Sequence, residues 1–320
     1  MTSGHLLVAS ASAKVALVRA AQDAVRRTNS HGLVVAGDSD LRAPARHVAD
    51  HFWAMPAPVC GNAAELLAGC RERGISVVLP TRDGELAFWA DVRARFVAAG
   101  ISVLVADPES VRRCLDKLAF AKFGENTGLP IIPAALTPRE CGEGPYVVKP
   151  RFGAGSAGIG LRLDLARARD HAARLEQPIF QPFVEGREIS IDAWMNGAGE
   201  PHGIVLRNRD RVVNGESQIT TTFRAPAIEA QADAVLRALQ LRGHAVMQAI
   251  VDAQERIHVI EVNARFGGAS TAAIAAGLDS LYWSLSELRE PETVPPFARI
   301  PGEVRQVRLA QDMIIHDPGV

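Results

Sequence analysis

Short apolar segments alternate with segments of helical periodicity along the first third of the chain. Buried strands are predicted at residues 5–9, 32–36, 76–79 and 101–106. Helices are predicted from the Ser-rich turn to residue 24, and over 65–72 and 85–98. Strands that alternate with helices indicate a parallel, doubly wound sheet, which binds ligands beyond the carboxyl ends of its strands. The turns at 10–12 and 81–85 are expected at that edge, either as ligand contacts or simply as helix caps.

The pattern changes after Asp107-Pro108. We predict one helix over 109–126, a Pro-bounded link over 129–133, and then mainly strands. Strands are expected at 146–149, 158–163, 179–184, 188–194, 203–206, 245–251 and 256–263, helices at 164–175, 228–239 and 271–276, and a last strand or short helix at 306–313. This order is typical of an α+β unit with antiparallel hairpins.

Composition limits the classes of function. The chain has 320 residues, with 35 Lys plus Arg against 36 Asp plus Glu, and a formal net charge of −1. Such a balance gives no field that attracts nucleic acid or an anionic membrane. No apolar run approaches the ~18 residues of a membrane span, and the apolar segment near the N-terminus lacks a basic leader, so we interpret it as a strand. The four cysteines form no CxxC pair, which predicts reduced thiols and a cytoplasmic location.

Glycines dominate the loop at 153–160, which reads GAGSAGIG. Its first six residues fit the pattern G-x-G-x-x-G, but the alternation of Ile159, Leu161 and Leu163 predicts a strand where a dinucleotide-binding loop requires a helix. No Lys-Ser or Lys-Thr follows, which excludes a Walker loop. The loop is either a hairpin that folds over a triphosphate through its N–H groups, or a mobile surface hairpin without a ligand.

Lysine is rare in this chain. Only four of the 35 basic residues are lysine, namely Lys14, Lys117, Lys122 and Lys149. A coding bias accounts for the many arginines, so the four lysines mark positions where a compact ammonium is preferred to a planar guanidinium. Lys149 comes directly before the glycine-rich loop, where a flexible ammonium reaches the α- and β-phosphates of a nucleotide.

The segment 245–268 combines two apolar strands with a row of polar side chains. A polar turn at 252–255 places Gln248 across from about Glu261, and side-chain alternation puts Glu261, Asn263 and Arg265 on one face. Carboxylate and amide oxygens suit Mg²⁺, with Mn²⁺ as an alternative, in a shell shared with ATP phosphates. Arg265 is placed to clamp a phosphate during its transfer. The competing interpretation is an ordinary solvated sheet face.

Together these segments resemble the ATP-grasp superfamily, and within it proteins like the large subunit of carbamoyl phosphate synthase. The most specific match is IEVNARFGG, which is similar to the E-x-N-x-R metal strand. YVVKP with the glycine-rich hairpin resembles the lid, FQPFVEGREISID the adenine and ribose segment, and LPTRDGEL and PESVRRCLDKLAF the end of the preceding domain and the first lysine helix. The resemblance covers nearly the whole chain.

The resemblance implies three units and an assignment of residues. The units are an α/β pre-ATP-grasp domain with a parallel doubly wound sheet (1–108), an ATP-grasp lid subdomain with its leading helix (109–184), and an α+β core subdomain with the metal strand (185–320). ATP phosphates would be contacted by Lys117, Lys149, Gly153, Gly155, Ser156 and Gly158. Adenine would bond the backbones of Gln181 and Val184, and the ribose hydroxyls would bond Glu188. Gln181 departs from the family, which usually has Glu there.

The catalytic and substrate residues follow from the same resemblance. Gln248, Glu261 and Asn263 would hold Mg²⁺, while Arg265 and Lys149 would act in catalysis. The acyl substrate would face Arg207 or Arg211 and the N–H groups of Gly267 and Gly268. The basic stretch 207–224 is alternatively a solvated loop without a substrate.

The implied activity is that of an ADP-forming carboxylate–amine ligase, which converts an acid to an acyl phosphate that an amine then attacks. Expected partners are a small-molecule carboxylate, an amine and a second copy of the chain in a homodimer, but neither nucleic acid nor membrane. One alternative is an acyl-phosphate-forming, carbamoyl phosphate synthase-like subunit of a larger enzyme. The other is a regulatory module that binds a nucleotide without catalysis, although nucleotide affinity alone would not require the full metal strand.

Overall fold

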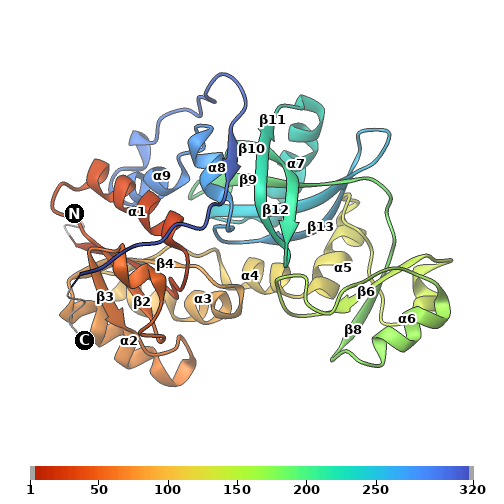
Figure 1. Ribbon diagram of the computed structural model, residues 1–320, viewed down its shortest axis with the longest axis horizontal. Helices are drawn as coiled ribbons and strands as arrows, with labels where there is room; N and C mark the ends of the chain where they lie inside the picture. The colour runs from red at the N-terminus through yellow and green to blue at the C-terminus, as the bar shows by residue number, and fades with distance from the viewer. Residues whose placement is uncertain (1–3, 317–320) are drawn as a thin grey trace.

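The computed structural model describes residues 4–316, which fold around three sheets (Figure 1). The helices are α1 (Val15–Thr28), α2 (Ala63–Glu72), α3 (Asp83–Ala98), α4 (Pro108–Leu115), α5 (Lys117–Thr127), α6 (Leu165–Ala172), α7 (Pro226–Leu239), α8 (Ser270–Ala275) and α9 (Ser280–Arg289). The strands are β1 (His5–Ala9), β2 (Val34–Asp38), β3 (His51–Ala54), β4 (Ile75–Pro80), β5 (Ser102–Val103), β6 (Tyr146–Pro150), β7 (Gly160–Leu163), β8 (Pro178–Pro182), β9 (Arg187–Met195), β10 (Pro201–Val213), β11 (Glu216–Phe223), β12 (Gly243–Val251), β13 (Ile257–Asn263) and β14 (Arg305–Val307).

The N-terminal sheet is parallel, in the order β3-β2-β1-β4-β5. Helices cover both of its faces. Helix α1 packs on the side of Leu6 and Val8, whereas α2 and α3 pack on the side of Leu7 and Ala9. This confirms the predicted doubly wound α/β sheet. The hydrophobic pattern did not predict β3, because this short edge strand buries a single side chain, that of Trp53.

The helix predicted over 109–126 is in fact two helices that meet at Asp116. This residue has extended backbone (φ −95°, ψ 100°) and caps α5, since its carboxylate accepts hydrogen bonds from the N–H groups of Leu118 (3.0 Å) and Ala119 (3.2 Å). It also accepts a hydrogen bond from Nε of Arg151 at 2.7 Å. The break places Lys117 on the first turn of a new helix instead of the middle of a long one.

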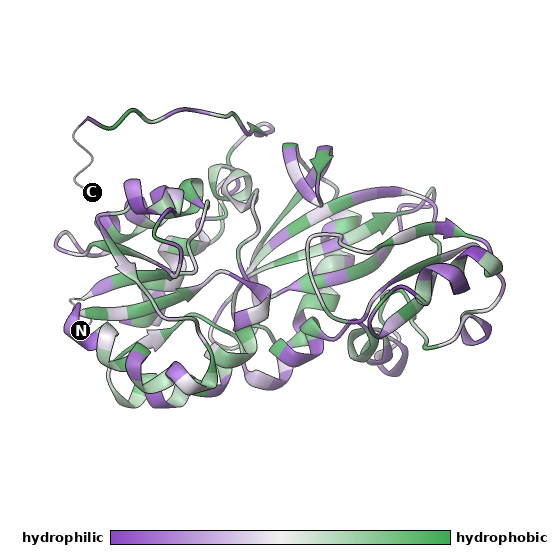
Figure 2. Ribbon diagram, turned by 60° about the horizontal axis from the view of Figure 1, so that its bottom comes forward, coloured by the Kyte–Doolittle hydropathy of each residue, from purple (hydrophilic) through white to green (hydrophobic). Residues whose placement is uncertain are grey.

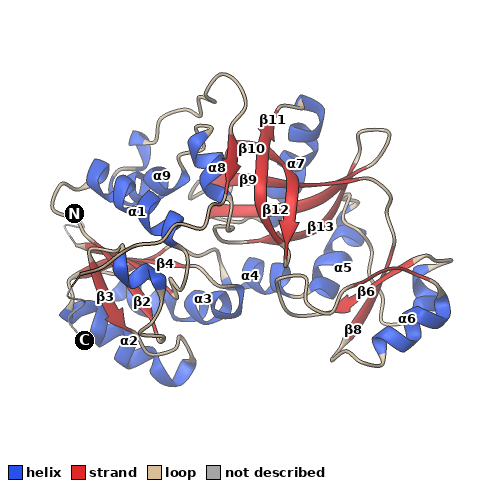
Figure 3. Cartoon of the chain, in the orientation of Figure 1, coloured by secondary structure: helices blue, strands red, loops and turns tan. Residues whose placement is uncertain are grey.

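The other two sheets are antiparallel, which confirms the α+β character of the second part of the chain (Figure 3). The small sheet, β7-β6-β8, carries the glycine-rich hairpin between β6 and β7. The large sheet has the order β13-β12-β9-β10-β11-β14. One of the two alternatives for the basic stretch does not hold. The stretch 207–224, weighed as a solvated loop, forms most of the β10–β11 hairpin, whose pairs run from Leu206↔Phe223 to Val213↔Glu216.

An apolar cluster joins the parallel sheet to the large sheet. Leu281 and Leu285 of α9 and Phe266, which follows β13, pack in one cluster with Leu17 and Val18 of α1. Figure 2 shows that green and purple segments alternate along both helices and strands, as expected for elements with one face in the core. The packing of α1 against α9 holds the carboxyl end of β1 close to the end of β13. Within residues 4–316, no helix is long and apolar enough to cross a bilayer.

Candidate functional site

The candidate site is a cavity of about 1960 Å³ between the parallel sheet and the large sheet. On one side it is lined by the turns that follow β1 and β4, where the sequence predicts the ligand edge of the parallel sheet. On the other side it is lined by β10–β13 and by the segment after β14. Predicted site residues in its lining are Gly155, Ser156, Arg207, Gln248, Glu261, Asn263, Arg265, Gly267 and Gly268.

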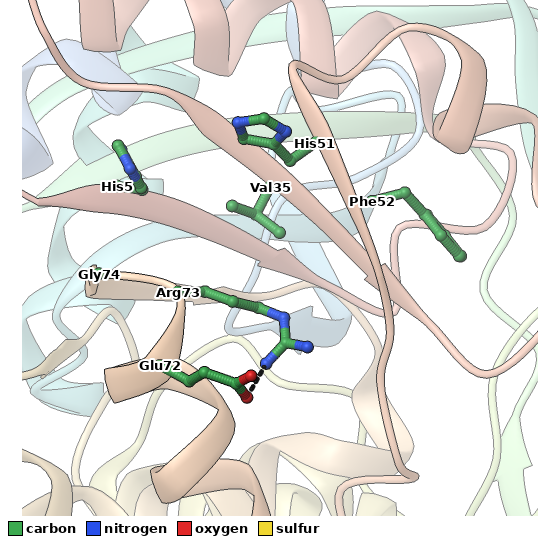
Figure 4. A pocket seen from close by; sticks show the side chains of 7 residues that line it. All are labelled: His5, Val35, His51, Phe52, Glu72, Arg73 and Gly74. Carbon is green, nitrogen blue, oxygen red and sulfur yellow. Dashed lines mark hydrogen bonds and ion pairs between the residues drawn. The ribbon is translucent and has the colours of Figure 1, made fainter.

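A second cavity, of about 500 Å³, lies at the opposite edge of the parallel sheet (Figure 4). His5 and His51 begin strands there, and Gly74 comes directly before another strand. Figure 4 shows Glu72 and Arg73 paired with each other, with Nη1 and Oε2 2.8 Å apart. Because ligands of parallel sheets bind at the carboxyl ends of the strands, the larger cavity is the candidate active site.

The metal strand has the predicted geometry. Gln248 on β12 pairs directly with Glu261 on β13, and Nδ2 of Asn263 donates a hydrogen bond to Oε1 of Glu261 at 3.2 Å. Among residues 4–316, no cluster of three His, Cys, Asp or Glu side chains is placed to hold a metal. One carboxylate and two amides fit Mg²⁺ because this ion is usually bound by one or two carboxylates and completes its shell with substrate phosphates and water.

Lys149 brings the small sheet to this strand. Its side chain is only 3% exposed, and burial lowers the pKa of its ammonium to about 8. The charges of Glu261 and Glu188 raise that pKa while the charge of Lys117 lowers it, so three charged side chains act on Lys149. Lys149, Lys117, Glu188 and Glu261, predicted from four separate segments, therefore lie in one neighbourhood.

The glycine-rich hairpin lies over the same region. Gly153, Gly155 and Ser156 have positive φ values of 117°, 73° and 57°, and a Cβ atom on either glycine would meet nothing within 4 Å. Nζ of Lys117 donates a hydrogen bond to the carbonyl of Gly153 at 2.7 Å. The hairpin thus has the open backbone and the adjacent ammonium that a phosphate-binding lid requires. Gly158, the third predicted glycine contact, also has a positive φ of 70°.

The predicted adenine and ribose residues are placed as follows. Gln181 is buried, and its Nε2 donates a hydrogen bond to the carbonyl of Ile132 at 3.1 Å. This side chain therefore ties β8 to the link at 129–133, and Val184 follows β8 in a half-buried position. Oε1 of Glu188 lies 3.0 Å from Nε of Arg209. The contacts of these residues with a nucleotide stay predictions.

Arg265 joins the metal strand to the parallel sheet. Its Nε donates a hydrogen bond to Oδ1 of Asp83 at 2.9 Å, and its Nη2 is paired with the second oxygen of that carboxylate. Both side chains are largely buried. The sequence analysis did not predict this partner, although Asp83 belongs to the turn that it placed at the ligand edge.

Two arginines of β10 enter the cavity, but not both of those predicted. Arg207 is 2% exposed and its Nε lies 2.6 Å from Oδ2 of Asp192. Arg211 is absent from the cavity lining, because β10 is irregular on both sides of this residue and loses its alternation there. The second arginine of β10 in the cavity lining is Arg209. It was not predicted from the sequence, although it stands two residues from Arg207 on the same strand.

Arg207 belongs to a buried polar network that contacts the loop of Gly267 and Gly268. Asp192 also lies 3.1 Å from Nε2 of His244, which in turn lies 3.0 Å from Oγ of Ser270. That hydroxyl accepts a hydrogen bond from the N–H group of Gly267 at 2.8 Å. The carbonyl of Gly268 accepts a hydrogen bond from Arg308. The network fixes the loop after the metal strand. Burial alone would raise the pKa of Asp192, but Arg207 and His244 hold this pKa well below its usual range.

Comparison with known families agrees with this geometry. Residues 6–104 match the family described as PylC-like, N-terminal domain, and residues 114–269 match the family described as ATP-grasp domain. Residues 114–269 form an ATP-grasp domain. The ATP-grasp match includes the glycine-rich hairpin and the metal strand, and the N-terminal match covers the parallel sheet. No curated protein gave a significant match to this chain.

Solved structures share the fold of this chain. The biotin carboxylase domain of 2-oxoglutarate carboxylase from Hydrogenobacter thermophilus, solved as a dimer with MgADP, ADP and bicarbonate, aligns with a TM-score of 0.74 and 17% identity, over 94% of this chain and 73% of that one. N5-carboxyaminoimidazole ribonucleotide synthetase from Thermotoga maritima aligns with a TM-score of 0.64 and 17% identity, over 92% and 77%. L-amino acid ligase from Bacillus licheniformis aligns with a TM-score of 0.67 and 16% identity, over 92% and 77%.

Proposed function

We propose that this protein is an ADP-forming carboxylate–amine ligase that uses MgATP. The observation that carries the proposal is the burial of Lys149 beside Glu261. A buried ammonium at this position costs stability unless a bound anion compensates it, and a triphosphate coordinated to a metal at Glu261 is such an anion. The structural relatives include a biotin carboxylase, a carboxyaminoimidazole ribonucleotide synthetase and an amino acid ligase.

The proposed reaction has two steps. A carboxylate oxygen of the acid attacks the γ-phosphorus of ATP, the bond from that phosphorus to the β,γ-bridging oxygen breaks, and ADP leaves. The amine nitrogen then attacks the acyl carbonyl, loses a proton to solvent and expels phosphate. Mg²⁺ held by Gln248, Glu261 and Asn263 would neutralise charge on the phosphates.

The residues of the chain contribute binding and charge in this scheme. Lys117 and Lys149 would bind phosphate oxygens, and Arg265 would stabilise charge on the transferred phosphoryl group. Arg207 and Arg209, both in the cavity lining, are the candidates to bind the acyl substrate. The glycine-rich hairpin would keep water from the acyl phosphate.

The test is product analysis. The protein is incubated with MgATP and a panel of amino acids and small acids, with and without amines, and ADP, AMP and phosphate are measured separately. We expect ADP and phosphate in equal amounts with at least one acid, and loss of turnover with EDTA. AMP as the main product would refute phosphoryl transfer. Nucleotide binding without turnover on any acid would favour the regulatory alternative.

A pair of variants locates the activity. Glu261→Gln is expected to lower turnover by roughly 100-fold or more, because it removes the single carboxylate of the metal strand. Glu176→Gln, an exposed carboxylate outside the cavity, is the matched control and should leave turnover unchanged.

Light scattering of the purified protein tests self-association, which we propose because the Hydrogenobacter relative was solved as a dimer.

A further inference from the structure

The turns after β1 and β4 form a braced platform on the far side of the cavity from the glycine-rich hairpin. We define the platform as residues 10–14 and 81–85. Oγ1 of Thr81 donates hydrogen bonds to the carbonyls of Ala9 (2.7 Å) and Ser10 (3.0 Å), and Oγ of Ser10 lies 2.7 Å from both carboxylate oxygens of Glu85. These contacts are buried and tie the two turns together.

The backbone of the platform is strained. Ser10 and Ser12 have φ values of 52° and 46°, in the left-handed region that residues other than glycine rarely adopt. The N–H group of Ser12 donates a hydrogen bond to Oδ2 of Asp38 at 2.8 Å, which holds the turn in this conformation. Residues kept in such conformations cluster at ligand-binding sites, because surrounding contacts must over-determine them.

Lys14 is the uncommitted cation of the platform. Its Nζ donates a hydrogen bond to the carbonyl of Ser10 at 2.9 Å, and within residues 4–316 it makes no ion pair shorter than 4.0 Å. The neighbouring acids have other partners: Asp83 is paired with Arg265, and Glu85 is bound by Ser10 and lies 3.4 Å from Arg82.

The pKa of Lys14 supports this description. Burial lowers the pKa most, the charges of Arg265 and Arg82 lower it further, and Asp38 and Glu85 raise it without restoring the usual value. An anion bound beside this ammonium would relieve the repulsion. Lys14 therefore lies close to Arg265. Lys149 belongs to a different group of charges, which consists of Glu261, Lys117 and Glu188.

We propose that the platform binds an anionic group, carboxylate or phosphate, of the amine substrate, with Lys14 and Arg82 as its ligands. This inference rests on the proposed ligase function and deepens it. Lys117 and Lys149 are placed for the nucleotide, since both Lys117 and Glu261 act on the charge of Lys149. The amine must instead approach the acyl group near Arg265 from the side that the platform lines, so an amine anchored by its own anionic group would be oriented for attack.

The scarcity of lysine makes a direct test practical. The full chain is acetylated briefly with acetic anhydride, and modification of Lys14, Lys117 and Lys122 is quantified by peptide mass spectrometry. Exposed Lys122 on α5 is the internal reference. A probe that consumes acetic anhydride lowers the labelling of all lysines alike, so the ratio of Lys14 to Lys122 labelling is unaffected. The probes are matched pairs that differ by an anionic group: glycine against methylamine, and ethanolamine phosphate against ethanolamine. MgADP is the separate probe for the nucleotide site.

We expect glycine or ethanolamine phosphate to lower the labelling of Lys14 relative to Lys122 at least fivefold, and the partners that lack the anionic group to have no effect. Which of the two protects distinguishes a carboxylate from a phosphate. Arg82→Gln should raise the protecting concentration at least tenfold, whereas Arg95→Gln, at an exposed position of α3, the helix that Arg82 precedes, should not.

Three results would overturn the inference. They are no protection of Lys14 by either anionic probe, equal protection by methylamine or ethanolamine, and protection of Lys14 by MgADP alone. Failure of the proposed function gives a different result, namely no protection of Lys117 by MgADP. The two hypotheses are thus separated in one data set.

Discussion

The substitution Lys149→Met tests whether the buried ammonium is retained for ligand binding. In the ligand-free protein, burial lowers the pKa of Lys149 from 10.5 to about 8. This difference corresponds to roughly 3 kcal/mol by which the folded state at pH 7 is disfavoured relative to an unfolded chain with an ordinary lysine. Methionine has a similar length and no charge. We therefore expect Lys149→Met to raise the free energy of unfolding by about 3 kcal/mol at pH 7.

The pH dependence of this gain is specific. The pKa is lower in the folded state, so the destabilisation by Lys149 is complete below pH 8. It decreases between pH 8 and 10.5, where the folded protein has released the proton and the unfolded chain still holds it. Urea unfolding of both proteins at pH 7 and at pH 10.5, with EDTA and without nucleotide, measures the difference. The advantage of Lys149→Met should be largely gone at pH 10.5.

The same variant should bind ATP at least tenfold more weakly in the presence of Mg²⁺, because a charged hydrogen bond to phosphate is worth about 1.5–3 kcal/mol. Lys122→Met, at an exposed position of α5, is the control and should change neither stability nor affinity appreciably. A Lys149→Met protein that is no more stable than the wild type at pH 7, or that binds MgATP equally well, would refute the reasoning.

Three further predictions concern other parts of the structure. Asp83→Ala releases Arg265 from its carboxylate partner. It should lower kcat of the ligase reaction at least tenfold, with a smaller effect on the binding of MgADP. Steady-state kinetics and calorimetry measure the two effects, and an unchanged kcat would show that the pair does not position Arg265. Burial lowers the pKa of His244 below 6.5 despite its contact with Asp192. The unfolded chain therefore binds a proton at His244 more readily than the folded protein, and stability should fall as the pH drops below about 6.5. Urea midpoints of the wild type and of His244→Gln between pH 8 and 5 test this, and parallel curves for the two proteins would contradict it. Burial raises the pKa of Cys114 to about 12, whereas Cys60 is exposed, so iodoacetamide at pH 8 should modify Cys60 and spare Cys114 in the native protein, as mass spectrometry of the peptides will show.

The metal strand could be predicted from the sequence because its geometry is local. A short polar turn sets the register that pairs Gln248 with Glu261, and strand alternation places Glu261 and Asn263 on one face. The parallel sheet was predictable for a similar reason, since its central strands are buried on both faces and read as continuous apolar runs. Residue-level periodicity carries both kinds of information.

Features set by tertiary contacts or by a single polar residue were not predictable in this way. Helical periodicity continues across Asp116, yet its side chain caps a new helix and ends the previous one. The β11 strand is rich in Ser and Thr, so its buried positions do not stand out as apolar. The partner of Arg265 is Asp83, which is 182 residues away in the chain. Tertiary packing brings these two side chains together, through α1 against α9 and through the apolar cluster that α3 shares with β13.

We propose that a magnesium nucleotide binds between the small sheet and the metal strand, and a crystal structure of the protein with Mg²⁺ and a non-hydrolysable ATP analogue is the decisive experiment. Phosphate oxygens are expected within hydrogen-bond distance of Lys117 and Lys149, together with a metal ion coordinated by Glu261 and by oxygens of Gln248 or Asn263. A nucleotide bound on the platform beside Lys14, or one whose phosphates lie away from Glu261, would contradict it.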